Sequence, residues 1–116
     1  MARQAFQVEA GDLREPIYIQ TRVTVTDDGG GQEVSFADEF ETYAKVTPLS
    51  SQDRWRALGL QEAITHEVVV RYDSAITTKK RVRFDERFFL IEGILDPSLR
   101  GRRMILGCRE VANKKG

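Results

Sequence analysis

The sequence predicts a mainly β fold: a small antiparallel β-barrel or sandwich of six to seven strands, with one short helix and a long glycine-rich acidic loop. Short segments in which apolar and polar residues alternate dominate the chain, as in half-buried strands. Turn residues separate these segments at close spacing, and no repeated helices lie between them. The chain has 116 residues, 41% of them hydrophobic. We therefore expect a single domain over residues 1–116, ordered at about 12–111.

The first strand and the loop after it are expected in the N-terminal third. Alternation over residues 16–25 predicts a strand whose apolar face carries Ile17, Ile19, Val23 and Val25. Pro16 can begin this strand because its missing N–H disturbs no hydrogen-bond ladder there. Residues 26–39 contain three consecutive glycines and five acids. We expect a long loop there, in which Val34 and Phe36 form at most a short strand.

A second strand is predicted at residues 40–49, and the helix at 52–63. Two serines just before the helix can cap its N-terminus. Trp55 and Leu58 fall at helical spacing on one face. Gly59 weakens the interior, so we expect only one to three turns.

The C-terminal half is predicted to consist of strands alone. Alternating and apolar runs indicate strands at 65–73, 81–84, 87–96 and 104–111. Asp85 and Glu86 would form the tight turn of a hairpin between the second and third of these. No internal repeat and no linker divides the chain.

Residues suited to catalysis or metal binding are scarce. His66 is the one histidine of the sequence and Cys108 the one cysteine, and both share predicted strand faces with core residues. A histidine there is more often packed than a base, and such a cysteine is usually a small buried hydrophobe. Together they cannot supply a typical zinc site, and the glycine run lacks a phosphate-loop pattern. We expect no enzyme activity, no metal and no cofactor.

Features of secretion and membrane insertion are also lacking. One cysteine cannot form an internal disulfide, which suits a reducing cytoplasm. No apolar run is long enough to cross a bilayer, and the first eleven residues contain no signal-like apolar segment. We expect no membrane partner.

Charge is balanced overall but uneven along the chain. Residues 1–58 carry a net charge of −4 and residues 59–116 a net charge of +4. Complementary potentials of this kind favour head-to-tail contacts between copies; the alternative is that both halves are simply well solvated. Candidate contacts to DNA or to a partner are the basic residues Lys79, Lys80, Arg81, Arg102 and Arg103. Aromatic residues near them fit an OB-like nucleic-acid-binding module, although overall neutrality argues against one.

Two further segments are candidates for contacts with other molecules. The acidic loop could line a channel or form a movable plug, because carboxylates repel a phosphate backbone; the alternative is an ordinary hairpin loop. Its candidate residues are Asp27, Asp28, Gly29, Gly30, Gly31 and Glu33. Arg54, Trp55 and Arg56 are interface candidates because tryptophan and arginine are enriched at binding hot spots. The alternative for Trp55 is a core anchor.

Several segments also follow one another in a distinctive order. They are Ala10-Gly11-Asp12-Leu13, Asp27-Asp28-Gly29-Gly30, Tyr43-Ala44-Lys45-Val46-Thr47-Pro48-Leu49, His66-Glu67-Val68-Val69-Val70-Arg71-Tyr72 and Leu106-Gly107-Cys108-Arg109-Glu110. In this order and spacing the chain resembles the phage head–tail joining, or head-closure (stopper), family from about residue 10 to residue 111. It departs from the family at Tyr43, where tryptophan is frequent, and at Ser51-Gln52, where Gly-Glu often stands near Pro-Leu.

The resemblance implies a small β-barrel subunit of a phage head–tail connector. Such subunits form a ring that closes the DNA-filled head, with portal or adaptor proteins above and a tail terminator or tail tube below. Packaged double-stranded DNA would occupy the channel, and a long loop, here by position 27–39, would project into it. The protein would be made in the host cytoplasm and reside in the virion, in a ring of six or twelve copies. An OB-like nucleic-acid-binding module and a tail terminator protein are the alternatives.

Overall fold

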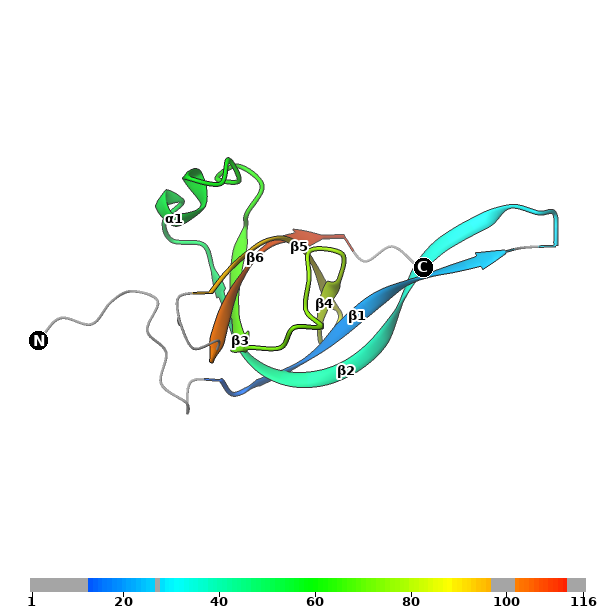
Figure 1. Cartoon of the computed structure of the whole chain (residues 1–116), viewed down its shortest axis with the longest axis horizontal. Helices are drawn as coiled ribbons and strands as arrows, with labels where there is room; N and C mark the ends of the chain where they lie inside the picture. Colours follow the sequence, from blue (N-terminus) through cyan, green and yellow to red (C-terminus); the bar gives the residue numbers. More distant parts are fainter. Residues whose placement is uncertain (1–12, 27, 97–101, 113–116) are drawn as a thin grey trace, which may run out of the picture.

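The computed structural model describes residues 13–26, 28–96 and 102–112, and this part contains six β-strands and one short helix (Figure 1). The elements are β1 (Glu15–Thr26), β2 (Gln32–Pro48), α1 (Asp53–Arg56), β3 (His66–Arg71), β4 (Arg81–Phe84), β5 (Arg87–Leu95) and β6 (Arg103–Val111). The mainly β class is confirmed, and every predicted strand is present. Within the described residues, no helix has the length and apolar character needed to span a membrane.

The six strands form one closed antiparallel barrel in the order β1-β2-β3-β6-β5-β4. β4 closes it by pairing with β1, where Ile19 lies opposite Val82. Each strand of the barrel therefore has a hydrogen-bonded neighbour on both sides, and this closure decides between the barrel and the sandwich that the sequence left open. Asp85 and Glu86 make the predicted tight turn between β4 and β5. Asp85 has a φ of 55°, a left-handed conformation that aspartate tolerates better than most residues.

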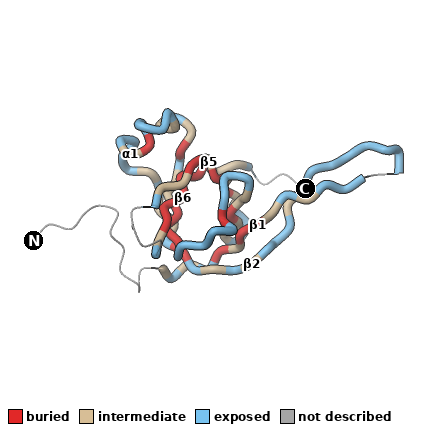
Figure 2. The backbone as a smooth tube through the Cα atoms, viewed as in Figure 1, coloured by how far each residue is buried: buried red, intermediate tan, exposed pale blue. Residues whose placement is uncertain are grey.

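The barrel interior holds the main core. Alternate residues of each strand point inward, as the period-two pattern predicts, and Figure 2 shows the buried residues gathered in the barrel. The buried side chains are Ile17, Ile19, Ala44, Val68, Val70, Ile76, Val82, Phe89, Ile91, Met104, Leu106 and Cys108. Ile76 belongs to the connection between β3 and β4, so this connection is anchored in the same core.

β1 and β2 continue past the barrel as a two-stranded hairpin that projects from it (Figure 1). Residues 21–26 pair with residues 32–37 and with no other strand; we call these two segments the hairpin arm. The loop predicted over 26–39 was therefore wrong for most of its length, because residues 32–38 of β2 pair with residues 20–26 of β1. Val25 was wrongly assigned to a core face. It lies beyond the barrel and is 52% exposed.

A second layer covers the outer face of β3 and β6. Trp55, Ile64, Val69 and Ile105 form its buried cluster, with Leu13, Leu49, Leu60 and Leu95 packed against it. The helix predicted at 52–63 is only the four residues of α1, within the expected one to three turns. Gly59 has a φ of 71°, which ends the helical run. Leu58, predicted to share the face of Trp55, is instead 52% exposed.

Candidate functional site: the hairpin arm and its root

The tip of the hairpin arm carries the acidic residues predicted to line or plug a channel. Asp28 and Glu33 are exposed there, and Gly30 adopts a φ of 86° that favours glycine. Gly29 and Gly31 complete the described part of the turn, while Asp27 lies outside the described residues. The arm itself is mostly exposed along its length (Figure 2).

The root of the arm, where it leaves the barrel, is held by an ion pair. Arg83 of β4 grips Asp38 of β2 through two hydrogen bonds: Nη2 donates to Oδ2 at 2.8 Å and Nε to Oδ1 at 3.2 Å. Gln20 of β1, only 5% exposed, donates from Nε2 to the same Oδ1 at 2.8 Å. The hydrogen bonds from Arg83 and then Gln20 lower the pKa of Asp38, and the bond to Asp38 raises the pKa of Arg83. Such paired, hydrogen-bonded contacts fix the direction in which two elements meet.

Arg81 joins four strands at this root. Its guanidinium lies between two aromatic rings, 4.1 Å from the centroid of Phe36 on β2 and 4.3 Å from that of Phe88 on β5. Its Nε also donates to Oε1 of Gln20 on β1 at 2.8 Å. Burial lowers the pKa of Arg81. The residue therefore acts as a stacked cross-link between the arm and the barrel.

Lys80 completes the root. Its Nζ lies 2.9 Å from Oε1 of Glu39 and 3.1 Å from Oγ1 of Thr21. Glu39 is the extra residue of a β-bulge in β2, since Ile19 pairs with Phe40 but the next residue of β1 pairs with Asp38. The acidic and basic segments, treated separately in the sequence, thus contact each other.

The predicted basic contacts do not form one patch. Lys80 and Arg81 are engaged inside the chain, whereas Lys79 is exposed beside them. Arg102 and Arg103 lie at the start of β6, which is not a neighbour of β4 in the barrel. Arg103 lies opposite Arg71 of β3.

The interface candidates on α1 separate into a buried and an exposed part. Trp55 is fully buried, and its Nε1 donates to Oε2 of Glu67 at 2.8 Å. This burial supports the core-anchor alternative. Arg54 lies with its Nε 3.4 Å from the same carboxylate oxygen. Arg56 is exposed, 3.5 Å from Asp53, so its side chain remains accessible to a partner.

His66 and Cys108 lie opposite each other on β3 and β6. The ring of His66 packs edge-on against Phe89, with centroids 5.0 Å apart, and its Nδ1 lies 2.9 Å from Oγ1 of Thr65. Burial lowers the pKa of His66 and raises that of the fully buried Cys108 thiol. A protonated, inaccessible thiol is a poor nucleophile. In the described ranges, no group of three histidine, cysteine or acidic side chains could hold a metal ion.

Sequence reasoning named Lys80 and Arg81 as candidate contacts but missed the other residues that build the root. Gln20, Phe36 and Phe88 carry no motif, and their partners stand far away in the chain. The hydrogen bond between Arg81 and Gln20 spans 61 positions, and that between Arg83 and Asp38 spans 45. No local pattern contains that information.

Comparisons with known proteins cover most of the chain. The model of the family described as phage head completion protein matches residues 8–111. Head completion protein gp16 of Bacillus phage SPP1 is 30% identical over 105 residues, which cover 90% of each sequence.

Two solved structures share the fold. A Shigella flexneri 2a protein solved in solution superposes with a TM-score of 0.67 at 24% identity, covering 92% of this chain and all of that one. A chain in the virion of a native gene transfer agent particle superposes with a TM-score of 0.56 at 20% identity. The match covers 85% of this chain and 96% of that one.

Proposed function

The chain belongs to the phage head completion protein family, and we propose that its copies form a ring that closes the DNA-filled head and joins it to the tail. A structural role in completing the phage head, as a component of the virion, follows from the family. The ring, the closure of its channel and the tail contact are our proposal. A single domain of non-catalytic character fits this role.

The hairpin arm is the observation that best supports closure of the DNA-filled head by the ring. It projects from a barrel that is already closed and filled, so the barrel core does not depend on it. The root fixes its direction through Asp38, Arg81 and Arg83. In a ring, arms from all copies would converge, and the acids at their tips would repel the phosphates of a duplex in the channel.

The partners follow from the same arrangement. Portal or adaptor proteins would meet one side of the ring, and a tail terminator or tail tube the other. Contacts between copies must be heterologous and close after six or twelve subunits. Arg54, which lies beside Glu67, and Arg56 remain candidates for these interfaces. Trp55 is buried beneath them and belongs to the core of the second layer.

The nucleic-acid-binding alternative has less support. The root uses Lys80, Arg81 and Arg83 for contacts within the chain, which leaves Lys79 as the exposed cation of that cluster. A dedicated nucleic-acid-binding module would need a broad face of such cations, whereas contact with a single phosphate needs only about two or three.

A phage with an early stop codon in this gene tests the role. Electron microscopy of lysates should show heads separated from tails of normal length. Normally joined particles would exclude the head-completion role, and tails of irregular length would point to a tail terminator.

A shortened arm tests the closure separately. Deleting Val25, Thr26, Gln32 and Glu33 removes two cross-strand pairs and keeps the alternation of the remaining residues. Particles should still join to tails but lose packaged DNA. The full-length double variant Val25→Thr and Val34→Thr is the control. Full DNA retention with the short arm would reject closure by the arm and leave head completion untouched.

A further inference from the structure

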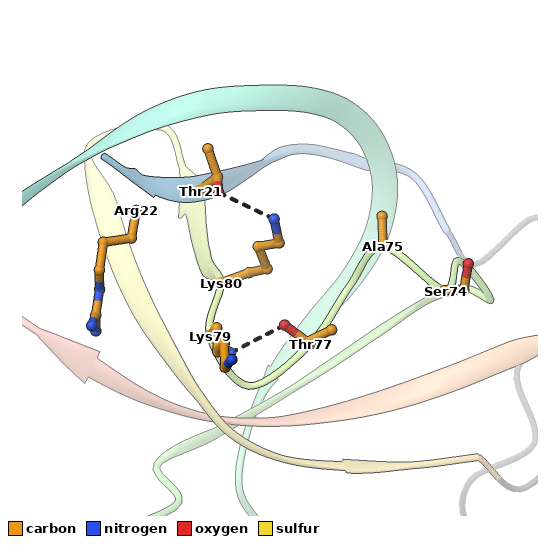
Figure 3. A pocket seen from close by; sticks show the side chains of 7 residues that line it. All are labelled: Thr21, Arg22, Ser74, Ala75, Thr77, Lys79 and Lys80. Carbon is orange, nitrogen blue, oxygen red and sulfur yellow. Dashed lines mark hydrogen bonds between the residues drawn. The ribbon is translucent and has the colours of Figure 1, made fainter. Parts of the chain in front are cut away.

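A polar cavity lies at the root of the hairpin arm, between β1 and the connection from β3 to β4 (Figure 3). Its volume is about 630 Å³, within the usual range of small-ligand sites. The lining residues are Thr21, Arg22, Ser74, Ala75, Thr77, Lys79 and Lys80. Three of these are cations, three carry hydroxyl groups and none is acidic.

The positive charge of this cavity is incompletely matched within the described residues. Neither Arg22 nor Lys79 forms an ion pair there, and Arg22 faces only the ring of Phe36 at 6.0 Å. The nearest acid of the connection, Asp73, turns its carboxylate to the N–H of Ala75 at 2.9 Å. Glu39 neutralises Lys80 alone. Two cations therefore stand beside hydroxyl donors without a carboxylate of their own.

The cavity wall is held in place by the chain itself. Ile76, 3% exposed, anchors the connection in the barrel core. Thr77 fixes the turn that follows, because its Oγ1 accepts from the N–H of Lys79 at 3.2 Å and its carbonyl from that of Lys80 at 3.0 Å. Figure 3 shows Lys80 reaching across to Thr21. The turn backbone and Lys80 are therefore already ordered before a ligand arrives, which lowers the entropic cost of binding.

We propose that this cavity binds a phosphate group, supplied by the backbone of the packaged duplex DNA. Guanidinium, ammonium and hydroxyl groups lining one cavity suit the several acceptor oxygens of a phosphodiester. The choice of DNA as the source rests on the proposed function, in which a duplex passes the ring. A bound phosphate would share Lys80 with Glu39. Binding would therefore weaken the ion pair of Glu39 at the bulge where the arm leaves the barrel.

Titration of the isolated, ¹⁵N-labelled chain tests the site without requiring a ring. In phosphate-free buffer, a 12-base-pair duplex and inorganic phosphate are added in separate experiments, and amide shifts are recorded. The duplex should shift the amides of Thr21, Ser74 and Thr77–Lys80 first. The double variant Arg22→Gln and Lys79→Gln should weaken duplex binding at least tenfold and lower the slope of log K against log salt by about 2. The matched control, Lys45→Gln and Arg71→Gln, removes the same charge from exposed strand positions outside the cavity and should bind nearly as the parent does.

The other outcomes overturn the proposal in distinguishable ways. Shifts with inorganic phosphate but not with the duplex would make this a site for a free anion. Equal weakening in both double variants, or shifts spread over all basic surfaces, would show unspecific attraction. Amide shifts that appear when the protein concentration alone is raised would show that the cavity contacts a neighbouring copy of the chain. No shift with any ligand would show that the cavity binds no phosphate. None of these results bears on whether the protein completes heads, which the stop-codon lysates decide.

Discussion

Trp55 lies directly over Gly107, so closely that a Cβ atom on Gly107 would come within 2.7 Å of Cη2 of the indole. Gly93 lies opposite Gly107 in the pairing of β5 with β6, and the same indole covers it. Because neither glycine has a side chain, the outer face of the barrel has a shallow depression at this point. It allows the largest side chain of the second layer to reach the sheet.

Gly107→Ala should destabilise the protein by about 1–3 kcal/mol, because the added methyl meets the rigid indole and Ile64. Gly93→Ala is the matched comparison. Its methyl would meet mainly Cδ1 of Leu60, the far end of a flexible side chain, and should cost less. Urea unfolding followed by fluorescence of Trp55, the one tryptophan of the sequence, measures both. Equal stability of the Gly107 variant and the parent would contradict the close packing.

Arg81 and Phe36 should be energetically coupled, because the guanidinium stacks on the ring at the root of the arm. A double-mutant cycle with Arg81→Lys and Phe36→Leu should give a coupling free energy of about 0.5–1 kcal/mol. Arg109→Lys with Phe36→Leu is the control cycle, since Arg109 pairs with Glu92 on β5 instead. A coupling no larger than in the control would mean that the stacking contributes nothing.

Acid should destabilise the fold in two stages. Burial lowers the pKa of His66 below its ordinary 6.5, so the unfolded chain takes up the proton first and stability falls as the pH drops below 6.5. Asp38 and Glu110, whose pKa values are lowered by Arg83 and Arg87 respectively, add a second loss below about pH 4.5.

Urea midpoints measured from pH 8 to pH 3 check this pH dependence. The variant His66→Gln should remove the first stage and keep the second. A midpoint that rises between pH 6.5 and pH 5 in the parent would show that His66 gains a proton on folding, contrary to its burial.

The thiol of Cys108 should resist modification in the native protein. Its side chain is fully buried on β6, and burial raises its pKa, so little thiolate is accessible. Ellman's reagent should react only as fast as the barrel opens, and at once in urea. An exposed cysteine introduced by Ser50→Cys in a Cys108→Ala background provides the rate of a free thiol. Similar rates for the two would place Cys108 in a mobile strand.

Much of the barrel could be predicted because its cause is local. Alternation along 65–73, 87–96 and 104–111 reports which side chains face inward, and that period is a property of the strand itself. The arm was missed because glycine and acid content between residues 26 and 39 outweighed the weaker alternation of Val34 and Phe36. The root cluster depends on which strands become neighbours when the barrel closes, so Gln20, Arg81 and Phe88 meet only through the completed topology.

The two layers around β3 and β6 have an evolutionary consequence. On β3, Val68 and Val70 face the barrel core and Val69 faces the second layer around Trp55. On β6, Leu106 faces the core and Ile105 faces the second layer. Strands buried on both faces have no side on which a polar residue is harmless. Inherited changes should therefore accumulate slowly there and quickly along the exposed arm, where the charge and length of the tip can diverge between phages while the barrel stays the same.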